Sequence, residues 1–490
     1  MKKWIAVGAG LVAMMLCGAA AIAQTCETLR SVRLPDMTVT RAERVASAGK
    51  LPASCKVAAT LRPTSDSEIR IEVWMPEQAA WNGKYEGTGN GGWGGSIDEG
   101  ALASAVARGY AASSTDTGHT GGSASFAMGH PEKLIDFGYR SIHAMTVAAK
   151  ALIAAYYGEP QKLAYFEGCS SGGRQALMEA QRYPEDYDGI IAGSATNNWT
   201  KMMFGRIWVG QATLSDAASY IPPAKYPVIH RAALAACDAM DGVKDGVIDD
   251  PRKCRFDPGV LACKQGDGPG CLTAAQVTAA RRIYSPATNP RTGEEIFPPM
   301  ERGSELVWGR LAGGPEPIQL ATDYFKYVVF EDAQWNFKTL NFDGDVAKAM
   351  QRDGGVLSAT DPDLRPFFAR GGKLIQYHGW TDQQVMPENS IHYYESVLAS
   401  VGKKADASYR LFMAPGMNHC GGGNGPNKFD MLSALEAWRE RGTAPDAVVA
   451  SHATDGKVDR TRPLCPYPEV AKYTGRGSTN EAANFVCAQP

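Results

Sequence analysis

The sequence has almost no net charge and no basic tract. Its 50 lysines and arginines are balanced by 52 aspartates and glutamates, so the formal charge is −2 over 490 residues. Proteins that bind nucleic acid or an anionic membrane present clustered positive charge, and we therefore expect neither partner. Internal repeats and low-complexity segments are also lacking, and the hydrophobic content of 44% is typical of a globular protein with a substantial core.

Motifs for metal-binding cysteines and for phosphate groups are missing as well. No two cysteines have the C-x-x-C spacing of a zinc site. The glycine-rich stretch over residues 85–95 is not followed by Gly-Lys-Ser/Thr, so it is not a phosphate loop. We expect no organic cofactor.

Residues 1–23 predict a cleaved signal peptide. Two lysines precede an apolar run over residues 5–21, which ends in the small-x-small pattern Ala21-Ile22-Ala23. The mature chain would then begin at Gln24 and be periplasmic or secreted, without a membrane span.

The cysteines support export. Of the 11 cysteines, one lies in the predicted signal peptide, and the even number left suits an oxidising compartment. Clustering along the chain suggests four local pairs: Cys26–Cys55, Cys237–Cys254, Cys263–Cys271 and Cys465–Cys487. By elimination Cys169 pairs with Cys420, although the spacing alone leaves other connectivities open.

A G-x-S-x-G motif stands at residues 168–172, with Ser170 at its centre. A strand-like run over residues 163–167 precedes it and a helix-compatible stretch over residues 175–180 follows, which is the context of a nucleophile elbow. Ser170 would lie beside the N-terminus of the helix, whose N–H groups favour a developing oxyanion. The glycine-rich loop 85–95 would supply another such N–H group. The alternatives are a glycine-rich turn before a helix and a flexible surface loop.

Strands and helices alternate along residues 69–200, which predicts a mostly parallel sheet covered on both faces. This pattern breaks near residue 200 and resumes near residue 356. The sequence therefore predicts an α/β-hydrolase core built from residues 24–200 and 356–490, with residues 201–355 as a large inserted lid domain. Residues 24–60 and the C-terminal tail are expected to be irregular arms stapled by disulfides.

A serine nucleophile needs a histidine base and an acid that orients it, and α/β-hydrolases carry them in the order Ser, acid, His on loops after strands. Of the eight histidines, His419 alone follows both a strand-like run, over residues 409–413, and a candidate acid, Asp382. Glu388 is the rival acid, and a capping role in a turn is the alternative for Asp382.

The cysteines provide a geometric check on this assignment. Cys169 and Cys420 are the direct neighbours of Ser170 and His419. If the serine and the histidine touch, the two cysteines come within the Cα separation of about 5.5–6 Å that a disulfide prefers. The pair found by elimination therefore agrees with the pair that the mechanism implies.

The chain resembles the tannase/feruloyl esterase family, whose members carry a paired Cys-Ser, Asp and His-Cys pattern. Here the pattern is formed by Cys169-Ser170, Asp382 and His419-Cys420. That family includes feruloyl esterases, tannases and the hydrolase of mono(2-hydroxyethyl) terephthalate. The resemblance covers essentially the whole mature chain. It implies an α/β-hydrolase core, a lid that binds the aromatic acid of the substrate, five disulfides and a structural Ca²⁺ ion. It also implies that the N–H groups of Gly92 and Ser171 form the oxyanion hole.

Residues 237–249 resemble the calcium loop in the lid of that family. The resemblance implies as ligands the carboxylates of Asp238, Asp241 and Asp245 and the carbonyls of Val243 and Val247. Dense oxygen donors with glycines for tight turns suit a hard cation. The alternative is a pair of Asp-Gly turns on the surface.

The sequence thus predicts a secreted serine carboxylic ester hydrolase that acts through an acyl-enzyme on a small aromatic ester, free or attached to plant cell-wall polysaccharide. Feruloyl and other hydroxycinnamoyl esters are favoured, and galloyl esters (a tannase) and terephthalate monoesters are alternatives. The arginine that reads the terephthalate carboxylate in its hydrolase has no counterpart in residues 315–323. A catalytically silent hydrolase fold that binds phenolics or polysaccharide is the alternative from another class. The aromatic residues expected either to hold the acyl group or to form lid core are Trp308, Tyr324, Phe325 and Tyr327.

Overall fold

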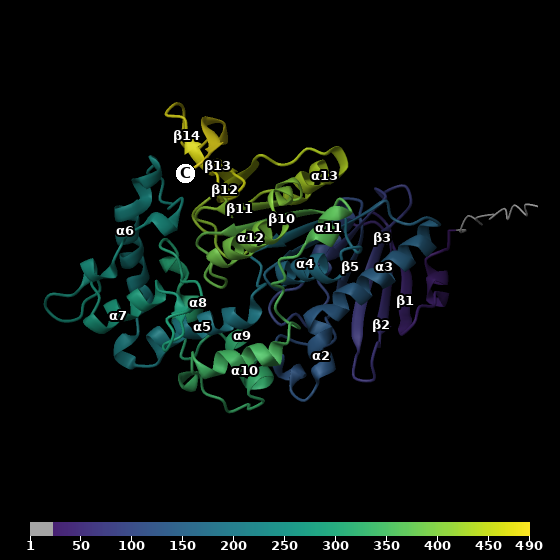
Figure 1. The fold of residues 1–490 in the computed structure, drawn as a ribbon. Coiled ribbons are helices and arrows are strands. Elements are labelled where there is room, and N and C mark those ends of the chain that lie inside the picture. Colours follow the sequence, from purple (N-terminus) through teal and green to yellow (C-terminus); the bar gives the residue numbers. More distant parts are fainter. Residues whose placement is uncertain (1–22) are drawn as a thin grey trace, which may run out of the picture.

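A central nine-stranded sheet runs through the computed structural model, which describes residues 23–490 (Figure 1). The predicted signal peptide, apart from Ala23, lies outside the described residues. In sheet order the strands are β1 (Met37–Val45), β2 (Ser54–Leu61), β3 (Ile69–Pro76), β5 (Ala111–Thr115), β4 (Lys84–Thr88), β6 (Leu163–Cys169), β7 (Gly189–Gly193), β10 (Lys373–Gly379) and β11 (Tyr409–Ala414). The six strands from β5 to β11 are parallel and β1, β2 and β3 extend them in antiparallel order, which confirms the mostly parallel α/β sheet.

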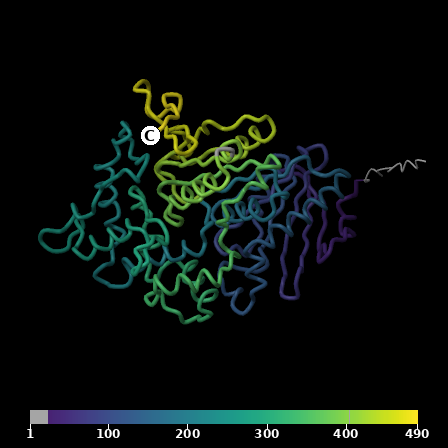
Figure 2. The backbone as a smooth tube through the Cα atoms, in the orientation of Figure 1, coloured from purple at the N-terminus to yellow at the C-terminus, as the bar shows by residue number. Residues whose placement is uncertain are grey.

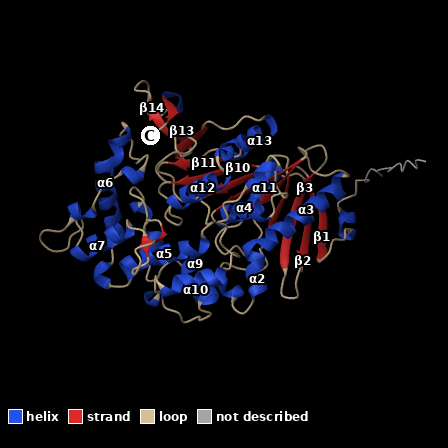
Figure 3. Cartoon of the chain, viewed as in Figure 1, coloured by secondary structure: helices blue, strands red, loops and turns tan. Residues whose placement is uncertain are grey.

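Helices cover both faces of this sheet (Figure 3). One face packs against α3 (Ser141–Tyr157), α4 (Ser171–Arg182), α11 (Arg365–Ala369) and α12 (Glu388–Val401), and the other against α1 (Glu99–Ala107) and α13 (Met431–Arg441). Side chains alternate between these two cores along β6, where Phe166 faces the first and Tyr165 the second. None of the described helices combines the length and the apolar character that a membrane crossing requires.

A helical segment is inserted between β7 and β10, and Figure 2 traces the chain out of the sheet and back. Its elements are α5 (Trp199–Leu214), α6 (Tyr226–Cys237), α7 (Ala274–Ile283), the short strands β8 (Ala287–Thr288) and β9 (Glu295–Phe297), α8 (Gly309–Ala312), α9 (Gln319–Asp323) and α10 (Gly344–Asp353). The segment has a core of its own, joined by side chains that precede β6, among them Trp93 and Phe137. The boundaries of a separate lid domain at residues 201 and 355 stay a prediction.

The aromatic residues of the inserted segment belong to that core. Trp308, Tyr324 and Phe325 are fully buried, and Tyr327 packs against the same cluster. The expectation that they hold an acyl group is therefore replaced by its alternative, the core of the lid.

The five predicted disulfides are confirmed: Cys26–Cys55, Cys169–Cys420, Cys237–Cys254, Cys263–Cys271 and Cys465–Cys487. Four of them close short loops, whereas Cys169–Cys420 spans 251 residues. Such bonds form and persist in oxidising compartments.

Two stretches that were expected to be irregular contain strands. Strand β1 was missed because only Met37 and Ala42 of its nine residues are buried, and a register shift between Val39 and Arg41 breaks the alternation. The C-terminal tail forms two antiparallel hairpins, of β12 (Val448–Thr454) with β13 (Lys457–Leu464) and of β14 (Val470–Tyr473) with β15 (Phe485–Ala488). One further short helix, α2 (Pro131–Ile135), precedes α3.

Glycines let α4 pack directly on the strands beneath it. A Cβ on Gly173 would lie 2.4 Å from the carbonyl oxygen of Gly193, at the end of β7. A Cβ on Gly168 would lie 2.5 Å from the carbonyl group of Gly172. Neither backbone atom is able to move aside like the end of a side chain, so both sites require glycine.

We predict that Gly173→Ala destabilises the protein and that Gly344→Ala does not. The first change forces α4 away from β7 and should cost about 1–3 kcal/mol, as overpacking usually does. Gly344 begins α10 with open space where its Cβ would be, so alanine there should be neutral or slightly stabilising. Melting temperatures of the two purified variants test this, and equal shifts would contradict the close packing of α4.

Candidate active site

Ser170 occupies a sharp turn between β6 and α4. Its backbone has φ 62° and ψ −120°, a conformation that a residue with a side chain rarely adopts. The turn is fixed on both sides: the Ser170 N–H donates to the Gly193 carbonyl (2.9 Å), and the Ser170 carbonyl accepts from the N–H and the hydroxyl of Thr196 (both 3.2 Å). A serine held in this way between a strand and a helix has the geometry of a nucleophile elbow.

Asp382 and His419 form a close pair on the loops that follow β10 and β11. His419 Nδ1 lies 2.7 Å from Asp382 Oδ2, and both side chains are almost completely buried. The two loops are joined by the backbone bond from the Thr381 N–H to the Met417 carbonyl (3.0 Å). A Cβ on Gly379 would lie 2.2 Å from that carbonyl oxygen, so only glycine permits this approach.

Hydrogen bonds keep Asp382 ionised despite its burial. Burial alone would raise the pKa of Asp382, but His419 and His378 hold it far below its usual range. Its second oxygen, Oδ1, accepts from the N–H groups of Gln384 (2.7 Å) and Val385 (2.9 Å). A fixed carboxylate beside Nδ1 places the hydrogen of His419 on that nitrogen and leaves Nε2 free as a base.

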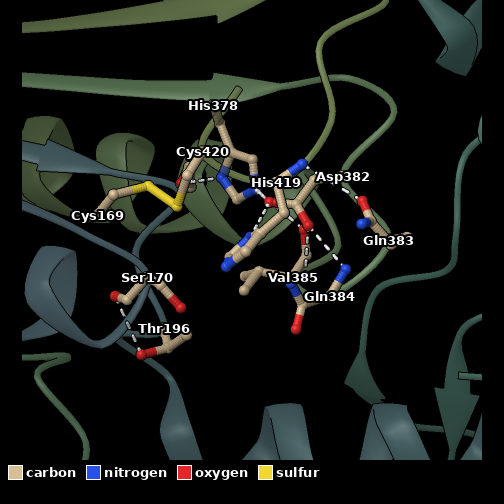
Figure 4. Close-up of a disulfide and its surroundings, with 11 residues drawn as sticks. Cys169, Ser170, Thr196, His378, Asp382, Gln383, Gln384, Val385, His419 and Cys420 are labelled. Atoms are coloured by element: carbon tan, nitrogen blue, oxygen red, sulfur yellow. Dashed lines mark hydrogen bonds and ion pairs between the residues drawn. A yellow bond between two sulfur atoms is a disulfide. The ribbon is translucent and has the colours of Figure 1, made fainter. Parts of the chain in front are cut away.

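The Cys169–Cys420 disulfide joins the turn of Ser170 to the loop of His419. The Cα atoms of the two cysteines are 6.0 Å apart. Figure 4 shows the His419 ring between Ser170 and Asp382, in the order that a triad requires. Among the described residues no hydrogen-bond partner is found within 3.5 Å of Ser170 Oγ, and such bonds commonly tighten only when a substrate binds.

Gly92 and Ser171 are brought together as well. The Ser171 hydroxyl donates to the Gly92 carbonyl at 2.7 Å, and Gly92 has a φ of +57° that favours glycine. The loop is also tied to α4 by Gln175, whose amide oxygen accepts from the Asn90 N–H (2.9 Å). The N-terminus of α4 therefore lies against the glycine-rich loop, beside Ser170.

The inserted segment reaches both halves of this site. Leu320 lies near Gly92, with its Cδ1 3.5 Å from where a Cβ would be, and the Trp93 indole donates to the Leu320 carbonyl (3.1 Å). On the other side, fully buried Arg206 donates from Nε to the Gln384 carbonyl (2.8 Å). Neither Leu320 nor Arg206 was predicted from the sequence.

His378 was set aside in the sequence because it precedes the acid, yet it contacts the acid directly. Its Nε2 lies 3.1 Å from Asp382 Oδ2. The signal that could have found it is the spacing of four residues between the two, at the end of one strand. The rival acid Glu388 instead lies near His392 (3.9 Å) and the buried Glu301.

The predicted calcium loop is a compact, acidic turn. Asp238 accepts from the N–H groups of Asp245 (3.1 Å) and Gly246 (3.1 and 3.2 Å), and Asp245 also pairs with Arg462 (2.7 Å). Burial, followed by the charge of neighbouring Asp241, raises the pKa of Asp249 to about 7. Crowded carboxylates that disfavour one another's charge are a donor set that fits a hard cation. The carbonyls of Val243 and Val247 lie on the same loop.

A second group of metal-ligating side chains was not singled out in the sequence. Within the described part of the chain, one such triplet has its ligand atoms within 4.8 Å of one another: His143, Glu179 and Asp186. His143 Nδ1 and Asp186 Oδ2 are 2.6 Å apart, so a hydrogen bond accounts for two of its members. The triplet lies at the end of α4 remote from Ser170.

Comparison with known proteins agrees with this geometry. A family model described as tannase and feruloyl esterase matches residues 55–488. The chain belongs to the tannase and feruloyl esterase family. An uncharacterized esterase of Xanthomonas campestris pv. campestris is 39% identical, over 96% of this chain and 92% of its own. The protein named "Probable feruloyl esterase B-2" of Aspergillus terreus is 33% identical, over 88% of this chain and 86% of its own.

Solved structures of this family share the fold. Feruloyl esterase B from Aspergillus oryzae superposes with a TM-score of 0.88 at 30% identity, covering 94% of this chain and 99% of its own. Tannin acyl hydrolase from Aspergillus niger superposes with a TM-score of 0.81 at 23% identity, covering 95% of both chains, which supports the fold alone. The α/β-hydrolase fold is thereby confirmed, and this member of the tannase and feruloyl esterase family is a carboxylic ester hydrolase.

We predict that loss of the Cys169–Cys420 disulfide lowers both turnover and stability. The bond closes 251 residues, against eight for Cys263–Cys271. The chain-entropy model gives roughly 5 kcal/mol for the long loop and roughly 2.5 kcal/mol for the short one. Only the long one holds the turn of Ser170 to the loop of His419, so its loss should also reduce kcat.

The matched measurement compares two double variants, Cys169→Ala with Cys420→Ala and Cys263→Ala with Cys271→Ala. Melting temperature and ester hydrolysis are followed for both, and non-reducing peptide maps of the wild type fix the connectivity. A Cys169 found as a free thiol, or linked to another cysteine, would contradict the geometry described above.

Proposed function

We propose that this esterase hydrolyses esters of aromatic acids by serine catalysis. Ser170 Oγ attacks the ester carbonyl while His419 Nε2 accepts its proton, and Asp382 stabilises the resulting imidazolium. The N–H groups of Gly92 and Ser171 stabilise the oxyanion. The alcohol leaves with the proton from His419, and water, activated by the same histidine, then releases the acid from the acyl-enzyme.

One observation carries this proposal: three residues from distant parts of the chain are joined at one place. The strained turn of Ser170 is linked by Cys169–Cys420 to the loop of His419, whose Nδ1 bonds a buried, ionised carboxylate. Nucleophile, base and orienting acid are the groups that acyl transfer requires. The catalytically silent alternative would not need the strain at Ser170.

The names of the relatives support the substrate class. Several curated relatives of 32–33% identity are named probable feruloyl esterases, and a solved neighbour of 30% identity is feruloyl esterase B, so feruloyl and other hydroxycinnamoyl esters are our first choice. The substrate would be a small aromatic ester, free or attached to plant cell-wall polysaccharide. The apolar side chain of Leu320 beside Gly92 suits an aromatic acyl group. Galloyl esters and terephthalate monoesters remain the alternatives within the same chemistry.

We also propose that the protein is exported to the periplasm or the medium. The five disulfides and the signal-peptide pattern of residues 1–23 support this location.

We predict that Ser170→Ala abolishes hydrolysis while the fold is retained. Removal of a triad member usually lowers turnover by several orders of magnitude. Hydrolysis rates are measured at equal concentrations of four esters: methyl ferulate, methyl gallate, mono(2-hydroxyethyl) terephthalate and p-nitrophenyl acetate. The control variant is Ser400→Ala, which changes an exposed serine of α12. The highest kcat/KM is expected for methyl ferulate.

Three results would change this proposal. Preference for the gallate or the terephthalate ester would select that alternative. Near wild-type rates from a folded Ser170→Ala variant would remove Ser170 from the mechanism. A wild-type protein inactive on all four esters would favour a binding function.

We further propose that the acidic loop of the inserted segment binds a structural Ca²⁺ ion. The ion would be held by the carboxylates of Asp238, Asp241 and Asp245 and by the carbonyls of Val243 and Val247. The ion would neutralise the loop and take no part in the chemistry.

Chelation is predicted to lower the melting temperature, and added Ca²⁺ to restore it by mass action. The variant Asp241→Asn should lose this response, whereas Asp363→Asn, at a partly exposed site elsewhere, should keep it. The measurement is thermal unfolding of protein shown by elemental analysis to be free of metal. An unchanged melting temperature in that metal-free protein would contradict the site.

A further inference from the structure

His378 is a buried histidine whose hydrogen positions are determined by its neighbours. It is the penultimate residue of β10 and has no exposed surface, and its Nε2 lies 3.1 Å from Asp382 Oδ2 and 2.9 Å from the Val385 carbonyl oxygen. Both neighbours accept hydrogen bonds and neither is able to donate one. Nε2 of His378 must therefore carry a hydrogen.

The other ring nitrogen, Nδ1, receives a hydrogen bond. It lies 2.7 Å from the hydroxyl of Ser390, which also accepts from the side-chain amide of Gln376 (2.8 Å). The amide oxygen of Gln376 in turn accepts from the hydroxyl of Tyr409. Because Ser390 already accepts from Gln376, its own hydrogen is free for Nδ1 of His378. Tyr409 therefore donates to Gln376, Gln376 to Ser390, Ser390 to His378 and His378 to Asp382.

Reversing the direction of donation along this relay, the hydrogen-bonded chain Tyr409, Gln376, Ser390 and His378, would cost free energy. If the Gln376 amide were turned over, the Tyr409 hydroxyl would lose its acceptor, and Ser390 would donate to Gln376 rather than to His378. Nδ1 of His378 would then be left without a partner, or the ring would become a buried cation. Buried polar groups without partners are rare and costly. The observed arrangement gives each of these polar atoms a partner and keeps His378 neutral.

We propose that His378 is a positioning residue for the reaction, held by Tyr409, Gln376 and Ser390 as the neutral Nε2–H form and acting through Asp382. This inference rests on the proposed serine mechanism. Asp382 Oδ2 accepts from two histidines, and only one of them, His419, adjoins Ser170. His378 fixes the carboxylate in place and shares its charge.

The hydrogen bond from His378 to Asp382 also affects the base, His419. A donor on Asp382 reduces the strength with which that carboxylate stabilises protonated His419. Arg206 of α5 is a further charged group near this carboxylate, and it donates to the carbonyl of Gln384; burial lowers the pKa of Arg206 to about 10, so it stays charged at neutral pH. Removal of the His378 donor should therefore shift the acidic limb of kcat/KM to higher pH.

The test compares His378→Met, which has no donor, with His378→Gln, whose amide nitrogen is able to replace Nε2. For His378→Met we expect kcat to fall on the order of 10- to 100-fold, the usual effect of losing a hydrogen bond to a charged group. KM should change little, and the acidic limb should move to higher pH. His378→Gln should restore most of kcat and the wild-type limb. Melting temperatures confirm that both variants are folded.

The wild-type protein allows a measurement that needs no loss-of-function variant. With ¹⁵N-labelled histidine rings, the His378 signals, identified by their absence from His378→Gln, should show the neutral Nε2–H form from pH 6 to pH 8. A cation or an Nδ1–H form would overturn the proposal. So would an unmoved limb in a folded His378→Met variant, or equal losses in the two variants. Failure of the serine mechanism is distinct, because Ser170→Ala would then remain active.

Discussion

The bond between Cys169 and Cys420 is the constraint on which the site depends. In the sheet, β6 and β11 are separated by β7 and β10, so the strands that carry Ser170 and His419 are about 14 Å apart at the usual spacing. The two cysteines nevertheless have Cα atoms 6.0 Å apart. The loop after β11 must therefore fold back over the ends of the intervening strands, and the disulfide holds it there. Asp382, which follows β10, lies beneath this crossing.

The inserted segment is connected to both sides of the chemistry. Its residue Leu320 contacts the glycine-rich loop through Trp93, and its residue Arg206 holds the backbone that follows Asp382. A shift of α5 would move Arg206 relative to the loop of Asp382, and a shift of α9 would move Leu320 relative to the glycine-rich loop. These contacts give the segment a mechanical role in supporting both loops.

The parts of the site that were predicted from sequence are those with a local or ordered pattern. The turn of Ser170 has a fixed spacing, and Asp382 follows from chain order. His419 follows from chain order and from the cysteines beside it and beside Ser170. The aromatic side chains of the inserted segment have no such pattern. Their role depends on contacts between distant residues, such as the edge-to-face packing of Phe204 with Phe325, whose ring centroids are 5.0 Å apart. Strand β1 was missed because its outer face is polar and its register shifts.

The relay behind Asp382 shows why a buried anion is tolerated at this position. The carboxylate accepts four hydrogen bonds, two from backbone N–H groups of its own loop and two from histidines. Three of these donors are fixed, because two belong to the backbone and the third, His378, is held from behind by Ser390. Only His419 adjoins the serine, and in the proposed mechanism it exchanges a proton with it. A carboxylate held by three fixed donors keeps its charge in place while a proton moves, which is the preorganisation that electrostatic catalysis requires.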